Sequence, residues 1–272
     1  MKTKTLLIAA ATLAVGAISS QAQVYSQNVV GYVNVPIGAN AFTMCANQLV
    51  TGTDTAKTNC NIQAVLGKNG WVSDVNSAIN TTVYVWDLGT HNWDNYYFYT
   101  SDDALNGLGQ TFGDGWYDGA GGFSTATLAP GAGYFIHNVA ATTNTLVGTV
   151  VTGTNVYTIN QGFTTFSVIQ PISTNLDASI VGLNGVSDVN SVNNTAYYHW
   201  NKTTSNWDTF YYFTSDDALN GLGVTYGDGW YTGDGSLFLA TSPTYWPKVG
   251  EGYFIHQVVA TPLYYTNTFN IQ

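Results

Sequence analysis

Arginine is absent from this sequence, and lysine occurs only six times against sixteen acidic residues, which leaves a formal net charge of −10 at pH 7. Lysine and arginine make most protein contacts to phosphate, so their shortage argues against nucleic acid as a partner. The same sign of charge argues against anionic lipid surfaces. Nucleic acid and acidic membranes are therefore not expected as partners.

Residues that favour helix surfaces are also scarce, because Glu251 is the single glutamate in the chain. Aspartate, asparagine and glycine, which favour turns, take the place of glutamate, lysine and arginine. Threonine, valine and the aromatic residues are frequent and suit the pleated surface of a sheet. No window sustains a 3.6-residue apolar period beyond one or two turns. The composition therefore predicts an all-β extracellular protein.

Long apolar runs are missing except near the beginning of the chain. Two lysines precede an uncharged apolar run over residues 6–18, and Ser20 and Ala22 occupy positions −3 and −1 of a cleavage site. We interpret residues 1–22 as a cleaved signal peptide, since a membrane anchor needs about 20 apolar residues. No later segment is long and apolar enough to span a bilayer. The mature chain is expected to be secreted or located at the cell surface.

Cysteine is scarce as well, with Cys45 and Cys60 as the only two. In an exported protein an even pair is expected to be oxidised, so we predict a disulfide between Cys45 and Cys60. Closing a loop of about 15 residues contributes on the order of 3 kcal/mol to stability. Two free thiols or half of a metal site are the alternatives, and no histidine nearby in the sequence supports the second.

The chain consists of one module written twice. The decapeptide TSDDALNGLG occurs at residues 100–109 and again at residues 214–223, and the same spacing of 114 relates three pairs of tryptophans. The spacing grows to 119 for GYFIH, which starts at Gly133 and again at Gly252. The second copy therefore carries five extra residues before that segment. Such self-similarity predicts a duplicated structural unit.

Alternation of apolar and polar residues, together with turn residues between them, predicts the strands of each copy. Copy one has predicted strands at residues 29–35, 41–49, 83–87, 93–100, 133–139 and 146–150, and copy two at residues 196–200, 207–214, 252–259 and 266–271. We expect an all-β fold with two tandem copies of a β-sandwich or barrel-like module, residues 23–146 and residues 147–272. We also expect an approximate two-fold between the copies, an exchange of strands at the join, where residues 146–150 resemble residues 29–33, and a short capped helical turn in each copy.

Four segments follow one another in a recognisable order: VYSQNVVGYV at residues 24–33, VYVW at 83–86, LAPGAGYFI at 128–136 and FNIQ at 269–272. In this order they resemble a family of secreted β-repeat proteins of environmental Gram-negative bacteria, with an N-terminal VYSxNxVGYV segment and LAPGxGxFI strands. The resemblance covers essentially all of the mature chain. It implies export and a β-rich fold, and it brings no catalytic residues. The sequence departs from the family at Gln48, where proline is usual.

The repeated decapeptide has two interpretations. Ser101 or Ser215 suits an N-cap, the aspartates that follow suit the first turn, and Asn-Gly suits its end, so a capped helical turn is predicted. Alternatively, these aspartates and those just downstream bind calcium through their carboxylates, although the order of an EF-hand is absent. The candidate calcium ligands are Asp102, Asp103, Asp114, Asp118, Asp216, Asp217, Asp228 and Asp234. The two interpretations are compatible if the turn positions the carboxylates.

The aromatic residues also have two interpretations. Trp86, Trp93 and their copy-two partners alternate along strands, which is typical of core and cross-strand packing. Phe238, Tyr245 and Trp246 instead fall in a proline-punctuated insertion of copy two. They form either a glycan-binding surface, where rings stack on sugars, or a lid over the core of that copy.

Nothing in the sequence indicates catalysis. Of the four histidines only His137 and His256 are repeat equivalents, and both adjoin apolar strand residues. No nucleophile elbow, HExxH helix or phosphate loop is present. We therefore expect a non-enzymatic structural, cell-surface or extracellular-matrix protein that self-associates through its terminal strands. The alternative is a calcium-dependent carbohydrate-binding module. The partners expected are another copy of the chain or cell-surface glycans, and calcium is the one cofactor considered.

Overall fold

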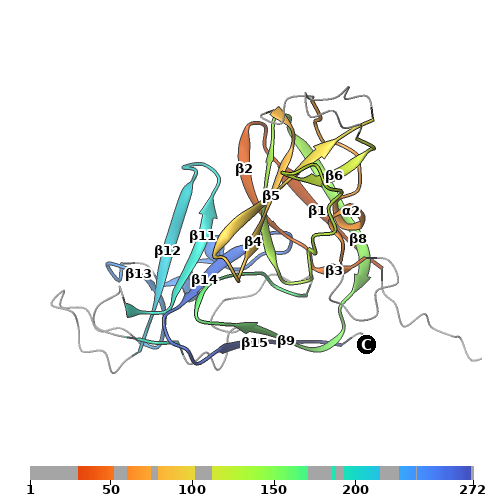
Figure 1. Ribbon diagram of the computed structural model, residues 1–272. Helices are drawn as coiled ribbons and strands as arrows, with labels where there is room; N and C mark the ends of the chain where they lie inside the picture. Colours follow the sequence, from red (N-terminus) through yellow and green to blue (C-terminus); the bar gives the residue numbers. More distant parts are fainter. Residues whose placement is uncertain are drawn as a thin grey trace, which may run out of the picture.

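The computed structural model shows how the two copies fold (Figure 1). It describes residues 30–51, 60–74, 79–101, 112–170, 185–187, 193–214, 227–236 and 238–270. The predicted signal peptide lies outside the described residues. So do Asp102, Asp103, Asp216 and Asp217 of the repeated decapeptide.

Copy one forms a five-stranded antiparallel sheet and a smaller three-stranded sheet. Its elements are β1 (Val30–Ile37), β2 (Ala41–Ala46), β3 (Leu49–Val50), α2 (Ile62–Leu66), β4 (Thr82–Asp87), β5 (Asn92–Tyr99), β6 (Gly115–Asp118), β7 (Gly133–Asn138) and β8 (Thr142–Val150). The large sheet has the order β2-β7-β4-β5-β6, and the small sheet has the order β1-β8-β3. Strand β8 extends past residue 146, where the sequence placed the boundary between the copies.

Copy two repeats this plan. Its elements are β9 (Gly153–Ile159), β10 (Gly162–Phe166), β11 (Ala196–Asn201), β12 (Asn206–Phe213), β13 (Gly229–Thr232), the 3₁₀ helices η3 (Leu239–Thr241) and η4 (Pro243–Tyr245), β14 (Tyr253–Gln257) and β15 (Leu263–Phe269). The large sheet has the order β10-β14-β11-β12-β13, and β9 pairs with β15 in a two-stranded ribbon. The expected all-β class is confirmed by this arrangement.

The hairpins β4–β5 and β11–β12 form because their turns satisfy the local backbone. In copy one the carboxylate of Asp87 accepts the amide of Gly89, and His91 adopts the left-handed conformation that the turn needs. In copy two the side chain of Asn201 accepts the amide of Thr203, and Ser205 is left-handed. The same turn is thus made by different residues.

In each copy the smaller sheet covers one face of the large sheet. Val33 of β1 and Leu146 of β8 belong to the same buried cluster as Val83 of β4. Ile159 of β9 and Ile255 of β14 share the corresponding cluster of copy two. Each copy therefore has the two packed layers of a sandwich.

The expected exchange of strands between the copies is wrong. Strand β1 pairs with β8 along its whole length, and β9 pairs with β15. The counterpart of β1 is therefore β9, which precedes β10 as β1 precedes β2, and not residues 146–150 as the sequence comparison indicated. A short repeat of Val, Gly and Thr matches many strands, and only the pairing distinguishes them.

The predicted disulfide is also wrong, because Cys45 and Cys60 are free thiols in the structure. Both are buried in the core of copy one, but each Sγ donates to a different carbonyl. Cys45 reaches the carbonyl of Thr43 at 3.4 Å, and Cys60 reaches that of Leu49 at 3.7 Å. Burial raises the pKa of Cys45 to about 12, so its thiol stays protonated.

Helix α2 is the one α-helix among the described residues, and it was not predicted from the sequence. Asn61 caps its N-terminus by accepting the amide of Gln63, and Gly67 closes it with a φ of 61°. Ile62 and Leu66 point into the copy-one core. Within the described ranges, no helix has the length and apolar character needed to cross a membrane.

Candidate functional site

Three of the four candidate calcium ligands that the structure describes accept hydrogen bonds within turns and loops. Asp114 accepts the backbone amide of Ser101 at 2.9 Å, and this hydrogen bond lowers the pKa of its carboxyl group. Asp118 accepts the amides of Ala120 and Gly122. Carboxylates bound in this way stabilise the loop backbone.

In copy two, Asp234 follows the same pattern. Asp234 accepts the hydroxyl of Thr232 and both the hydroxyl and the amide of Ser236, and these hydrogen bonds lower its pKa to about 2. Asp228 lies exposed just before β13. In the described parts of the chain, no three histidine, cysteine or acidic side chains gather as a metal site would require.

The three aromatic residues of the insertion pack on copy two. Phe238 stacks on Tyr231 with ring centroids 4.7 Å apart, and Tyr245 contacts Phe210 at 4.9 Å. The indole nitrogen of Trp246 donates to the carbonyl of Leu239, which is itself fully buried. The three rings therefore pack on copy two, and each remains partly exposed.

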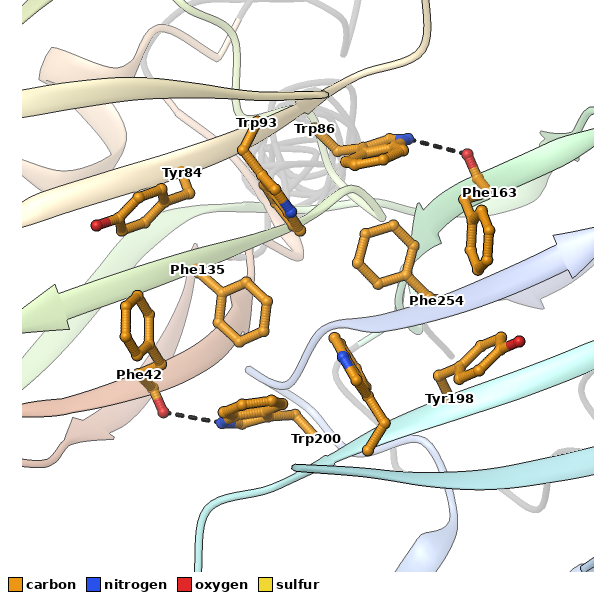
Figure 2. Close-up of a pocket in the computed structure, with 10 residues that line it drawn as sticks. Phe42, Tyr84, Trp86, Trp93, Phe135, Phe163, Tyr198, Trp200 and Phe254 are labelled. Carbon is orange, nitrogen blue, oxygen red and sulfur yellow. Dashed lines mark hydrogen bonds between the residues drawn. The ribbon is translucent and has the colours of Figure 1, made fainter. Parts of the chain in front are cut away.

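A different group of aromatic side chains forms an open cleft of about 580 Å³ between the two large sheets (Figure 2). All ten residues that line it are aromatic. They are Phe42, Tyr84, Trp86, Trp93 and Phe135 from copy one, and Phe163, Tyr198, Trp200, Trp207 and Phe254 from copy two. The two sets are repeat equivalents, residue for residue.

Strand alternation and register bring five rings to one face of each sheet. On β4, Tyr84 and Trp86 point to the cleft, whereas Val83, which precedes Tyr84 in the strand, points to the buried core of copy one. Trp93 on β5 lies directly opposite Trp86, and Phe135 on β7 lies directly opposite Tyr84. The copy-two rings occupy the same register positions on β11, β12 and β14.

Two hydrogen bonds join the copies in a reciprocal way. The indole nitrogen of Trp86 donates to the carbonyl of Phe163 at 2.9 Å, and that of Trp200 donates to the carbonyl of Phe42 at 2.9 Å. Figure 2 shows both bonds, one at each side of the cleft. Each copy thus contacts the other with the same residue and receives the same contact, as in an isologous interface.

The rings pack edge to face across the junction. Trp86 and Trp93 lie 5.3 and 5.4 Å from Phe254 of the other copy, at interplanar angles of 89° and 85°. Their equivalents Trp200 and Trp207 lie 5.1 and 5.7 Å from Phe135. Such pairs contribute about 0.5–1.5 kcal/mol each beyond the burial of their surface. The floor of the cleft is therefore a rigid aromatic layer.

A glycine seam beneath this layer holds the sheets close. Gly133 and Gly252 are repeat equivalents, and a Cβ added to Gly252 would lie 3.0 Å from the Cα of Gly133. Gln48 crosses the seam, because its amide nitrogen donates to Ser167 and its oxygen accepts the amide of Gly250. Gln48 thus connects the two copies.

The cleft carries no carboxylate, amine, thiol or imidazole among its ten lining residues. Burial raises the pKa of Tyr84 and of Tyr198, so both phenols are neutral at physiological pH. Two histidines flank the rim, with His137 centred 4.8 Å from Phe42 and His256 centred 4.4 Å from Phe163. Burial lowers the pKa of His256, which favours the neutral ring.

Sequence reasoning assigned the alternating tryptophans to ordinary core and cross-strand packing and so missed the cleft. A signal was present, because Val83 and Val85 already supply the core face of β4. The aromatic face of that strand therefore had no partner within its own copy. Only another sheet, or a ligand, was left to cover it.

Comparison with known proteins yields no relative: no family model, no curated protein and no solved structure matches this chain. The fold and the site define an all-β protein in which two copies of one module build a shared aromatic cleft. Its function is inferred from that geometry.

Proposed function

We propose that this is an exported, non-enzymatic protein that binds an uncharged ligand or partner segment in the cleft between its two sheets. The observation that carries the proposal is a cavity of about 580 Å³ lined by ten aromatic side chains. Ligand sites in proteins are concave and mostly apolar, with a few polar groups that orient the ligand. A contiguous apolar surface of this kind marks an interaction site in a soluble protein.

A binding role fits the cleft better than a catalytic one. General acid–base and nucleophilic catalysis need an ionisable group or an activated nucleophile within reach of the substrate. The nearest ionisable groups are His137 and His256, which pack on Phe42 and Phe163 at the rim, and no carboxylate or thiol accompanies them among the lining residues. The cluster around His199 lies on the other face of β11, since alternation turns its neighbours Tyr198 and Trp200 to the cleft.

The uptake of a neutral, environment-sensitive dye such as Nile red tests the site. We expect the folded wild-type protein to enhance the fluorescence of the dye and the double variant Phe42→Ala/Phe163→Ala to lose most of this enhancement. Both rings are at the rim and more than a third exposed, so their removal leaves each sheet's own core intact.

The matched control is Tyr32→Ala/Tyr264→Ala, which removes two exposed rings outside the cleft. This control is expected to bind the dye as the wild type does. Equal dye uptake by the cleft variant and the wild type would rule out the proposed site.

Self-association is a second candidate function. It is favoured by exposed side chains on the β1-β8-β3 sheet and by the edges of the β9–β15 ribbon. Tyr32 and Val147 are cross-strand partners on β1 and β8, and they expose 71% and 45% of their surfaces. Strand β9 is paired only with β15 among the described strands, so the ribbon presents backbone edges. We propose that a second copy of the chain binds to these exposed strands.

Sedimentation velocity over a range of concentrations tests this candidate. We expect the wild-type protein to sediment as a species larger than the monomer, and the variant Tyr32→Lys/Val147→Lys to sediment as the monomer. A wild type that stays monomeric at high concentration would remove self-association from consideration.

A further inference from the structure

The hydrogen-bonding groups of the cleft are mostly donors. The indole nitrogens of Trp86 and Trp200 are bonded to backbone carbonyls, but those of Trp93 and Trp207 have no acceptor among the described residues. Tryptophan is a donor only. Figure 2 shows the nitrogen of Trp93 at the end of the ring that reaches into the cleft.

Acceptors are scarce in the same space. The carbonyls of Phe42 and Phe163, which lie at the rim, already accept from the two bonded indoles. The remaining polar atoms of the lining side chains are the phenol oxygens of Tyr84 and Tyr198. A ligand that matches this cleft presents flat apolar groups and hydrogen-bond acceptors, and few donors.

Sugars match this pattern poorly. Every hydroxyl of a glycan donates as well as accepts, and a donor buried without an acceptor costs about 1–3 kcal/mol. Protein sites for polar ligands therefore include groups that pair with each buried polar atom. The ten aromatic side chains offer ring faces to stack on a sugar but little to receive its hydroxyl protons.

Proline-rich polypeptide matches it well. Proline has no backbone N–H, so a run of prolines presents carbonyl acceptors and no backbone donors. In the polyproline II helix these carbonyls point outward without internal hydrogen bonds, and the rings are flat and apolar. Domains that bind such segments use grooves lined by aromatic side chains.

The rings also form a continuous row, as an extended ligand requires. From one rim, Tyr84 contacts Phe42 at 5.6 Å and Phe42 contacts Phe135 at 6.1 Å. Trp207 then connects Phe135 to Phe254, with centroid distances of 5.7 and 5.5 Å. The row ends at the opposite rim with Phe163 and Tyr198, which repeat the arrangement of Phe42 and Tyr84.

We propose that the cleft binds an uncharged proline-rich segment in the polyproline II conformation, with the indole N–H groups of Trp93 and Trp207 donating to its carbonyls. This inference rests on the proposed binding function of the cleft. Because each copy supplies the same donor and the same ring faces, the cleft offers equivalent contacts to either direction of the segment.

The experiment uses the mature chain and isothermal titration calorimetry with a decaproline peptide. We expect measurable binding that weakens about fivefold to tenfold in Trp93→Phe and in Trp207→Phe, because each change removes one donor and keeps an aromatic ring. Nile red uptake is measured in both variants, and we expect it to fall less than the affinity for decaproline, because the dye uses ring faces and needs no indole donor. Trp246→Phe, which removes an indole N–H outside the cleft, is the matched control and should bind the peptide as the wild type does.

The outcomes separate this inference from the function on which it rests. Nile red binding without decaproline binding would overturn the proline-rich ligand and leave the cleft as an apolar site. Binding of cellohexaose that is lost in the two variants would assign the cleft to glycans instead. Decaproline binding that is unchanged in both variants would place the peptide elsewhere, and failure of dye and peptide together would overturn both proposals.

Discussion

The two large sheets are alike on the faces that meet and different on the faces that turn to their own cores. Each presents the same five rings to the cleft, two phenylalanines, two tryptophans and one tyrosine. On the opposite faces, Val85 of copy one corresponds to His199 of copy two, and Ala132 corresponds to Glu251.

The difference gives copy two a partly exposed polar cluster on this face. The two ring nitrogens of His199 lie 3.7 Å from Asp208 and 3.9 Å from Glu251, and Lys202 lies 3.9 Å from Glu251. Tyr253 donates to Glu251 at 2.9 Å. A face that meets its own repeat must match it ring for ring, whereas a face that meets its own ribbon only has to fit that ribbon.

The largest effect is expected where the two copies touch. A methyl group at Gly252 would collide with the backbone carbonyl of Cys45 and approach Gly133, and backbone cannot move aside. We expect Gly252→Ala to lower the free energy of unfolding by about 3 kcal/mol and to open the cleft. Urea denaturation and Nile red uptake measure the two effects.

Two other glycines are the controls for this prediction. At Gly133 the nearest obstacle is the flexible end of Met44, so Gly133→Ala should cost about 1 kcal/mol. Gly119 has open space around it, and Gly119→Ala should lie within about 0.5 kcal/mol of the wild type. Equal losses for all three would show that the seam is not tightly packed.

The second prediction concerns acid stability in copy two. Burial alone raises the pKa of Glu251, but His199, Tyr253 and the two nearby lysines outweigh it and lower the pKa from 4.5 to about 2. This carboxylate therefore stabilises the fold above pH 4.5, and its contribution, about 3 kcal/mol at most, is lost as the pH falls toward 2.

Glu251→Gln should accordingly flatten the dependence of stability on pH between 4.5 and 2, as measured by urea denaturation at several pH values. The exposed carboxylate of Asp94, at the copy-one position of Asp208, provides the control. Asp94→Asn should keep the slope of the wild type. A wild-type slope in Glu251→Gln would contradict the stabilising role of this group.

The third prediction uses two equivalent tyrosines. The hydroxyl of Tyr253 donates to Glu251 and accepts the amide of Lys248, whereas the buried hydroxyl of Tyr134 has no hydrogen-bond partner among the described residues. Tyr253→Phe should cost about 1–3 kcal/mol, and Tyr134→Phe should raise stability by up to about 1 kcal/mol. Thermal melting of the two variants measures both effects. Changes in melting temperature of the same sign would contradict the prediction that the two hydroxyl groups differ in their contribution to stability.

The smallest effect is expected at the cysteines, which are confined to copy one. Cys45 stands where copy two has Phe166, since both pair with the equivalent tyrosine of the next strand. Its buried thiol should not react with iodoacetamide in the folded protein, while both thiols should react in denaturant. A reductant should leave the melting temperature unchanged, and a fall in that temperature would show that Cys45 and Cys60 form a disulfide after all.

Local patterns in the sequence were sufficient for most of the strands around the cleft, but β10, which carries Phe163, was not among the predicted strands. The predicted hairpin at residues 83–87 and 93–100 matches β4 and β5 to within one residue at each end. Helix α2 was not expected, because five residues are too short to show a 3.6-residue period. Its identity depends on the cap at Asn61 and on burial against the copy-one sheet.

The candidate site was less accessible from sequence. Phe238 and Trp246 were candidates because they lie in a loop that contains prolines, and in the structure they pack on copy two. The rings of the cleft were interpreted as core residues. Alternation along a strand predicts on which face of the sheet a side chain lies, but it does not predict what packs against that face. Trp86 and Phe163 are 77 residues apart, and no local pattern predicts that they touch.

By itself, the sequence determined the all-β class, the duplication and the even spacing of aromatic residues along each strand, since these follow from composition and short-range periodicity. Only the tertiary structure decided which strands pair, that Cys45 and Cys60 remain apart, and that the aromatic faces of the two sheets meet. These outcomes depend on contacts between distant segments. The free energies of these contacts depend on how the distant segments pack against one another, and no short stretch of sequence predicts that packing.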